Sequence, residues 1–413
     1  MGIKKIKIIN FKSFENLEIE LGNLNVLIGA NASGKSNFVH VFEFLRDIVN
    51  SGLENAISMQ GGVEYLRNIN IGTSKNLSLK IVSNEEFMWL GKRSKEGFIL
   101  IKTYEIIYEF ALKFNKRGAG FKIVKDRLVQ QSEFFRLTKN QKKKEILGKG
   151  TIVIYRNNGK VKIDLDIPDK VSLKKEDIIP PFLREHKLQN HELILETPYF
   201  LPPLEKIFSD ISIYDFDPKL SKKATPITGK AELEENGNNL SIILKNIIGD
   251  KEKKRKLFNL IKNLLPFIKN LDVEKFADKS LLFKLQETYF ENQYLPASLI
   301  SDGTINITGL IVVLYFEKKN LVIIEEPERN IHPYLISKVV EMMKDAAQQK
   351  QLIVTTHNPE IVKYADLENI LLVYRDKMGF SKISRPVDKE EIKTFLKNDI
   401  GIEELYVQNL LEM

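Results

Sequence analysis

The chain of 413 residues contains no cysteine. This absence excludes disulfides, zinc–thiolate sites and a cysteine nucleophile, and it agrees with the cytoplasmic location that we expect. Long hydrophobic runs are also missing, because residues 309–316 are about the longest stretch and a membrane span needs roughly 18 residues. The first residues already alternate as a strand does, so we expect neither a signal peptide nor a membrane partner.

The charge of the chain allows more than one interpretation. The net charge is +8, with 43% hydrophobic and 29% charged residues, which is ordinary for a globular protein. The basic residues cluster at 142–144, 174–175, 222–223 and 251–256. Such clusters suit either the solvated faces of helices or a surface that follows the phosphates of DNA or RNA, and composition does not separate the two.

One segment fits the phosphate-binding pattern G-x-x-x-x-G-K-S/T. It consists of Gly29, Ala30, Asn31, Ala32, Ser33, Gly34, Lys35 and Ser36. An apolar strand precedes it, and Phe38, Phe42, Leu45 and Val49 follow at helical spacing. In this context the loop N–H groups surround phosphate oxygens at a helix N-terminus. We expect Lys35 to reach the β- and γ-phosphates of ATP and Ser36 to hold Mg²⁺; the alternative is a simple glycine-rich turn.

Two further apolar strands end in polar residues. Residues 321–324 run into Glu325 and Glu326, and residues 353–356 run into His357. Hydrolysis of a phosphoanhydride needs one group on the metal and another on the attacking water, so we assign Glu325 to the metal and Glu326 to the water. Ligands of an open α/β sheet bind outside the carboxyl ends of its strands. The three segments are therefore expected to meet, with Glu326, His357 and Lys35 as catalytic residues.

The order of these segments predicts an α/β P-loop fold with a parallel or mixed sheet. Its N-terminal half is expected at residues 1–85, an insertion at 86–284 and its C-terminal half at 285–413. We expect strands at 3–10, 17–21, 76–82, 98–107, 151–155, 161–165, 321–324 and 352–355, and helices at 254–271 and 333–347. Pro266 should kink or split the first of these helices. His186 and His191 lack the spacing of a metal site and are interpreted as surface residues.

Several motifs carry a family resemblance. They are Asn10-Phe11-Lys12-Ser13-Phe14, the phosphate loop, residues 299–304, residues 324–328 with 331–333, residues 355–358 and the ending at 401–406. Together they resemble the ABC-type ATPase heads of the SMC/RecF class, and above all the ATPases related to the overcoming-lysogenisation-defect (OLD) nucleases. The resemblance covers both halves of the ATPase domain and is weak across the insertion.

The resemblance implies a homodimer that holds ATP between two heads. Ser301 and Gly303 match the signature motif, which contacts the γ-phosphate bound by the partner subunit. Lys12 and Ser13 match residues near adenine and ribose, Asn37 joins the nucleotide-binding set, and Asn330 lies in a loop that lines the dimer interface. The alternative role for Ser301 is a helix cap, and both roles are compatible because a helix N-terminus also attracts anions.

The chain departs from the family pattern at several positions. Glu325 stands where many such ATPases have Asp, and Ala32 replaces a common glycine. The glutamine that senses Mg²⁺ is not assigned, with Gln60, Gln130 and Gln131 as candidates. No long coiled coil is present, and about 55 residues follow His357, too few for the Toprim nuclease domain of OLD proteins.

We therefore expect an ATP-hydrolysing switch with ATP and Mg²⁺ as cofactors, which controls a separate effector or a nucleic-acid transaction. Anti-phage defence or a toxin-like system is the setting that the resemblance suggests. The alternatives are a RecF-like DNA repair ATPase, a nucleotide-sensing scaffold with incidental hydrolysis, and, less favoured, the ATPase subunit of a transporter.

Overall fold

The computed structural model describes residues 2–94, 97–118, 120–137, 144–178, 187–197, 202–276, 279–290, 293–388 and 402–408. It divides into two compact units. The first contains Met1–Gly22, Ala32–Ile211 and Val373–Ser384, and the second contains Asn23–Asn31, Ser212–Leu372 and Arg385–Met413. Lys142, Lys143, His186 and Gly401, which the sequence singled out, lie outside the described residues.

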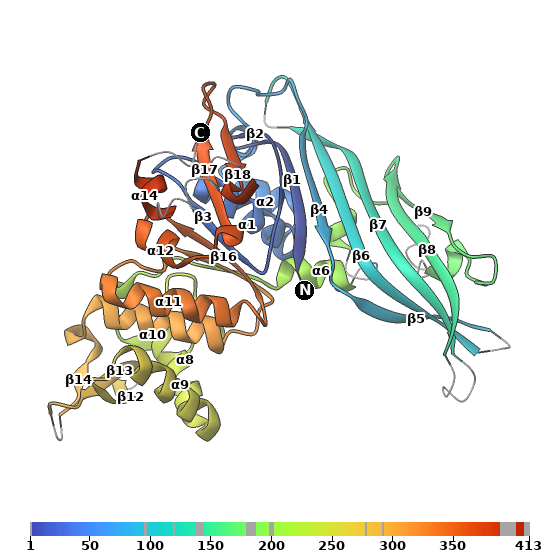
Figure 1. Cartoon of the computed structure of the whole chain (residues 1–413). Coiled ribbons are helices and arrows are strands. Elements are labelled where there is room, and N and C mark those ends of the chain that lie inside the picture. Colours follow the sequence, from blue (N-terminus) through green and yellow to red (C-terminus); the bar gives the residue numbers. More distant parts are fainter. Residues whose placement is uncertain are drawn as a thin grey trace. The chain divides into compact units, whose positions relative to one another are not determined.

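The first unit is built on an antiparallel sheet of long strands (Figure 1). Its strands are β1 (Ile3–Phe11), β2 (Phe14–Glu20), β4 (Leu77–Ser83), β5 (Phe87–Ser94), β6 (Gly97–Phe114), β7 (Phe121–Leu137), β8 (Lys144–Asn157) and β9 (Lys160–Asp166). The order is β2-β1-β4-β6-β7-β8-β9, and β5 pairs with β6. All strands that the sequence predicted between residues 3 and 165 are present, whereas the boundaries at 85 and 284 stay a prediction.

Aromatic side chains fix helix α1 (Lys35–Ser51) on this sheet. The ring centroids of Phe11 and Phe44 lie 5.9 Å apart, and those of Phe14 and Phe38 lie 6.3 Å apart. Full burial of such a side chain contributes roughly 2–3 kcal/mol. The helix that follows the phosphate loop is thus packed firmly against β1 and β2. The other helices of the unit are α2 (Leu53–Met59), α3 (Val63–Leu66), α4 (Lys175–Ile178), η1 (Ile194–Glu196) and α6 (Pro202–Ser209).

The second unit contains a parallel sheet of short strands. These are β15 (Leu321–Glu325), β16 (Gln351–Thr356), β3 (Leu24–Ile28) and the start of β17 (Ile370–Arg375), with β10 (Ile211–Tyr214) next to β15. Helix α11 (Pro333–Ala346) connects β15 to β16, which confirms the predicted strand–helix–strand crossover. Helix α10 (Asp302–Tyr315) is buried from Thr304 to Leu314. Every helix in the described ranges is too short or too polar to cross a membrane.

A smaller antiparallel sheet completes the second unit. It contains β11 (Thr225–Pro226), β12 (Ile268–Phe276), β13 (Ser280–Glu287) and β14 (Leu295–Pro296). The remaining elements are α7 (Pro218–Ser221), α8 (Leu240–Gly249), α9 (Lys251–Leu264), η2 (Ala297–Leu299), α12 (Pro359–Tyr364), η3 (Leu367–Asn369), η4 (Pro386–Asp388) and α14 (Ile402–Val407). In the first unit β17 continues as a hairpin into β18 (Ser381–Ser384).

The helix predicted at residues 254–271 is wrong at its C-terminal end. Helix α9 ends at Leu264, and residues 268–271 belong to strand β12. Pro266 has no N–H group and disfavours helical geometry at the preceding residue, so the chain leaves the helix there. The apolar residues Leu257, Ile261 and Leu264 are buried on α9 as expected, while Ile268 is buried from a strand.

Candidate functional site

The phosphate loop has the backbone of an anion-binding nest. Ala32 and Gly34 have φ angles of 62° and 118°, and α1 begins at Lys35. Left-handed residues at alternate positions turn successive N–H groups to one side, and the N-terminus of α1 adds partial positive charge. A Cβ at position 34 would lie 2.1 Å from Ser381 Oγ, so only glycine fits there. Ala32 adopts its left-handed backbone at a cost of about 1–2 kcal/mol. The segment therefore fits a chain of phosphates.

Ser13 and Asn37 meet beside this loop. Asn37 Nδ2 donates a hydrogen bond of 2.8 Å to Ser13 Oγ. Lys12 has a φ of 45°, and its backbone N–H donates to Leu66 O at 2.9 Å. Burial lowers the pKa of the Lys12 ammonium, against the opposing effect of Glu43. The contacts of these three residues with a nucleotide remain predictions.

The sequence predicted no role for Asn10. In the structure Asn10 anchors the motif that contains Lys12 and Ser13. It is buried with a φ of 53°, its Nδ2 donates to the carbonyls of Gly72 and Lys75, and its Oδ1 accepts from the N–H of Asn68. Asn68 Nδ2 in turn donates to Lys12 O at 2.8 Å. One asparagine thus fixes the turn that presents Lys12 and Ser13.

Within the second unit the motif-bearing strands end in register. Glu325 is paired with Thr355, and Thr355 is paired with Leu27. Neighbouring strands lie about 4.8 Å apart. The residues that follow these strands, which are Gly29–Asn31, Glu326 and His357, consequently leave the same edge of the sheet, as the sequence predicted for an open parallel sheet.

Glu326 lies at the centre of a charged network at this edge. Its Oε1 is 2.8 Å from His357 Nδ1, its Oε2 is 3.1 Å from an Arg329 guanidinium nitrogen, and Arg329 also binds Asp215 Oδ1 at 2.8 Å. Burial alone would raise the pKa of Glu326, but the hydrogen bonds from Arg329 and His357 outweigh it and lower the pKa. The carboxylate is thus kept ionised and oriented, as a group that accepts a proton from water must be.

The network also contains residues that the sequence did not single out. Glu328 is 6% exposed and accepts a hydrogen bond from Thr356 Oγ1. Burial raises the pKa of Glu328, although the bond from Thr356 acts in the opposite sense. Thr356 Oγ1 also accepts from the N–H of Asn358, which starts α12. Glu328 lies inside the motif at residues 324–328. Nothing in the sequence predicted its burial or the contact of Arg329 with Glu326.

Ser301 caps helix α10, as the alternative interpretation predicted. Its side chain accepts from the N–H of Thr304 at 3.2 Å. A Cβ at Gly303 would lie 2.5 Å from the carbonyl oxygen of Asn330, which has a φ of 62°. The signature segment and the loop after Glu326 are therefore in direct backbone contact. The contact of Ser301 and Gly303 with a partner's nucleotide stays a prediction.

The glutamine candidates make ordinary protein contacts. Gln60 Nε2 donates to Glu43 Oε2 at 3.0 Å, Gln131 accepts from Thr151 Oγ1 at 2.9 Å, and Gln130 is buried on β7. None of these contacts indicates a metal role. The exposed His191 lies with its Nδ1 3.5 Å from Glu54 Oε1, which agrees with a surface residue.

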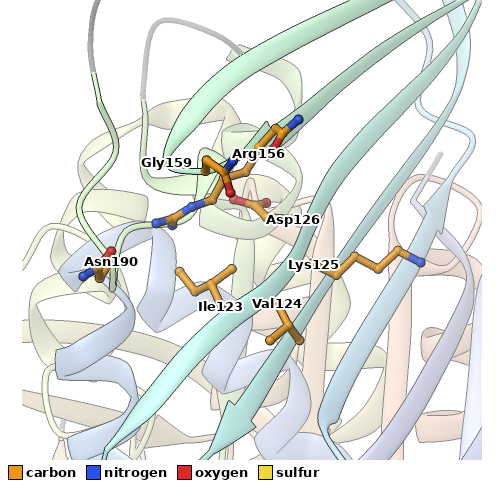
Figure 2. A pocket seen from close by; sticks show the side chains of 9 residues that line it. Ile123, Val124, Lys125, Asp126, Arg156, Gly159 and Asn190 are labelled. Atoms are coloured by element: carbon orange, nitrogen blue, oxygen red, sulfur yellow. The ribbon is translucent and has the colours of Figure 1, made fainter.

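A polar cavity of about 340 Å³ lies on the long sheet, apart from all nucleotide motifs in the sequence. Figure 2 shows Asp126 and Arg156 beside it. Asp126 accepts from Tyr108 Oη at 3.0 Å and from the N–H of Ile194 at 2.8 Å, and Arg156 donates to the carbonyls of Gln189 and Glu192. Burial raises the pKa of Asp126 to about 7. Both side chains thus fasten the segment 189–194 to the sheet.

Comparison with known proteins identifies the fold. Residues 1–362 match the AAA ATPase domain family. Among solved structures, an SMC head bound to the C-winged helix domain of ScpA is 15% identical, with a TM-score of 0.52 over 93% of this chain and 98% of that one. The predicted α/β P-loop fold is thereby confirmed, and it is similar to the fold of SMC heads.

Two curated relatives match over short segments. The uncharacterized protein MJECL43 of Methanocaldococcus jannaschii is 25% identical over 93 residues, which are 22% of this chain and 24% of the relative. The endonuclease GajA of Bacillus cereus is 45% identical over 47 residues, which are 11% of this chain and 8% of the relative. The matched segments thus span a quarter or less of either relative.

Proposed function

The chain belongs to the AAA ATPase domain family, and from this premise we propose that it is a switch driven by Mg²⁺-ATP. In this proposal ATP joins two copies head to tail, and hydrolysis lets them separate. The cycle controls a separate effector or a nucleic-acid transaction. The observation that carries the proposal is the shared edge of the parallel sheet, where Glu326 and His357 leave the strands beside the start of the phosphate loop.

Each residue of the site has a separate task in hydrolysis. The nest at residues 32–34 and Lys35 bind the phosphates, and Ser36 and Glu325 hold the metal. Bound Mg²⁺ would neutralise charge that develops on the phosphate oxygens. Glu326 orients the attacking water and accepts its proton. His357 is hydrogen-bonded to Glu326 through Nδ1 and fixes the carboxylate. In this proposal it also contacts the γ-phosphate.

The signature segment supports a site shared between two copies. Ser301 caps a long buried helix, and the N-terminus of such a helix attracts anions. Gly303 lies close against the backbone of Asn330. In this proposal a movement of the signature displaces the loop that carries Arg329 and Glu326. Nucleotide bound by one copy could in this way order the catalytic carboxylate of the other.

Mixing two inactive variants tests the shared site. Lys35→Ala should abolish nucleotide binding by its own loop, and Ser301→Arg should place bulk and charge against the partner's γ-phosphate. Each homodimer should be inactive. In the mixed dimer both lesions fall in one composite site and the other site is intact, so activity should return up to what one site supports. ATP-dependent dimerisation should be followed by light scattering alongside hydrolysis.

Normal ATP hydrolysis by monomeric Ser301→Arg would overturn the shared site and leave Ser301 as a helix cap. The control is Lys219→Ala, which changes an exposed residue outside the motifs. Ser241→Arg would not serve, because Ser241 is buried. A mixture of Lys219→Ala and Lys35→Ala should show the activity of two kinds of dimer only. These are the Lys219→Ala homodimers, which have two intact sites, and the mixed dimers, which have one.

A second function, nucleic-acid binding, is favoured by helix α9. Its residues Lys251–Lys256 are all exposed, and five of the six are Lys or Arg. Contacts with phosphates release counterions, so affinity should fall steeply between low and physiological salt. Reversing Lys253, Lys254 and Arg255 should weaken binding about equally for all sequences. The same reversal at Lys122, Lys160 and Lys162, exposed on the long sheet, is the control. Absence of binding at low salt, with and without ATP, would exclude this function.

The separate effector that the ATPase cycle controls is also part of this proposal. The 45% identity with 47 residues of the endonuclease GajA supports a setting in which an ATPase of this kind controls a nuclease, as in anti-phage defence. Preferential binding to DNA ends or gaps would instead favour DNA repair. Retention of function after loss of Glu326 would favour a nucleotide-sensing scaffold. Identifying the proteins that co-purify with Glu326→Gln in ATP tests the effector directly.

A further inference from the structure

The hairpin formed by β17 and β18 donates hydrogen bonds to two carbonyl groups of the phosphate loop. Arg375 Nε donates to Ala32 O at 3.0 Å, and Ser381 Oγ donates to Ser33 O at 2.6 Å. Ser381 is fully buried, and its backbone N–H donates to Ser13 O at 2.9 Å. All of these residues belong to the first compact unit. More than 300 positions of sequence separate the hairpin from the loop, |i−j| being 343 for the Arg375 contact.

The contact at Ser381 is one step of a hydrogen-bond chain. Asn37 Nδ2 donates to Ser13 Oγ at 2.8 Å, and Ser13 Oγ lies 2.8 Å from Ser381 Oγ. A hydroxyl has one proton, so Ser381, which donates to Ser33 O, accepts from Ser13. The chain therefore runs from Asn37 on α1 through both serines to the loop carbonyl. Bonds in such a series strengthen one another.

The two carbonyl contacts determine where the loop N–H groups point. A trans peptide group directs its C=O and its N–H to opposite sides. With Ala32 O bound to the hairpin, the N–H of Ser33 is directed away from the hairpin, and the bond to Ser33 O does the same for the N–H of Gly34. These are the N–H groups of the nest. The hairpin thus holds the outer side of the loop and leaves the inner side for an anion.

We propose that Arg375 and Ser381 are positioning residues for triphosphate binding, which hold the phosphate loop in its binding shape before the nucleotide arrives. This rests on the proposed ATP-dependent function. The hairpin itself is well braced, since Arg375 also donates to Gly379 O at 2.7 Å and Asp376 Oδ1 accepts from the N–H groups of Met378 and Phe380. Because the loop is ordered in advance, binding a triphosphate does not have to order it.

Calorimetric titration of the full chain with Mg²⁺-ATP and with Mg²⁺-tripolyphosphate tests this role. The variants are Arg375→Ala, Ser381→Ala and, as control, Lys377→Ala, which removes an exposed charge from the same hairpin. Loss of the hydrogen bond to the loop carbonyl should raise the Kd of both ligands roughly threefold to tenfold. The value of kcat at saturating ATP should stay within about twofold, because the residues touch neither the water nor Glu326. Lys377→Ala should match the wild type.

The melting temperature without ligand separates positioning from general stability. Arg375 is exposed, so Arg375→Ala should melt with the wild type while binding both triphosphates more weakly. Unchanged Kd values in Arg375→Ala and Ser381→Ala, with binding lost in Lys35→Ala, would overturn the hairpin's role alone. A wild-type chain that binds neither ligand would overturn the proposed function together with this inference.

Discussion

The parallel sheet and the long antiparallel sheet use polar residues in opposite ways. Strands β3 and β16 are buried at every position, and the polar groups of the candidate site gather where the parallel strands end. On β7 buried residues alternate with partly exposed ones along much of the strand, and on β9 every second residue is exposed. Parallel strands are covered on both faces, so chemistry is confined to their ends, whereas the long sheet distributes polar side chains over an exposed face.

Backbone strain is concentrated at the nucleotide motifs of both regions. Among the described residues, the non-glycine positions with positive φ are Asn10, Lys12, Ala32, Asn158, Glu326 and Asn330. Asn158 lies in the Asn-Gly turn between β8 and β9, where this geometry is normal. The others lie in the nucleotide motifs. Strain of this kind, about 1–3 kcal/mol per residue, persists where the surrounding structure enforces it for function.

The largest effect is expected when the same chemical change is made in both regions. Glu326→Gln should reduce ATP turnover roughly a hundredfold and retain ATP affinity, because the amide cannot accept the proton of water. Asp126→Asn, the matched change on the long sheet, should leave turnover near wild type. Single-turnover hydrolysis and equilibrium binding measure both quantities. Wild-type turnover in Glu326→Gln would remove this carboxylate from the mechanism.

A smaller effect is expected at Gly303. A Cβ there would lie 2.5 Å from Asn330 O, so Gly303→Ala must displace the loop after Glu326. Overpacking of this kind costs about 1–3 kcal/mol, and ATP-dependent dimerisation should weaken about tenfold or more. Gly249→Ala, at the end of α8 with nothing within 4 Å of the added Cβ, is the control. Light scattering with ATP distinguishes the two, and equal dimerisation would show that the Gly303 contact is not coupled to assembly.

Arg329 should act on the pH dependence of turnover. Its hydrogen bonds help to lower the pKa of Glu326 against the effect of burial. Arg329→Ala removes that contribution, so the pKa of Glu326 should rise and the acid limb of the kcat profile should move to higher pH. Asp215→Asn leaves both donors to Glu326 in place and should not move the limb. An unshifted limb in Arg329→Ala would assign it to another group.

Asp126 should affect stability and leave turnover unchanged. Burial raises its pKa from 3.8 to about 7, so the native state binds a proton that the unfolded state has lost between these values. Stability from this group is therefore present at low pH and is lost as pH rises towards 7. Asp126→Asn stays neutral, and its melting temperature should gain on the wild type from pH 5 to pH 8. Melting temperatures of the two proteins that change in parallel with pH would show that the folded structure does not raise the pKa of Asp126.

The phosphate loop was predictable because its chemistry is local. The glycines, Lys35 and the start of α1 lie within a few residues of one another, and apolar runs marked β3, β15 and β16. Periodicity failed only where a proline overrode it, at the end of α9. The burial of Glu328 was harder to predict, because Glu is a charged residue type. The fold nevertheless leaves Glu328 only 6% exposed, next to Thr356.

By itself the sequence determined the fold class, the phosphate loop and the carboxylates at the end of β15, since strands, helices and glycine-rich turns depend on short-range patterns of size, polarity and backbone freedom. Only the tertiary structure decided which groups Glu326 contacts and what holds the phosphate loop in shape. Arg329 reaches Asp215 across 114 positions of sequence, and Ser381 reaches Ser13 across 368. Contacts over such separations form when packed strands bring their ends together, and no local pattern records them.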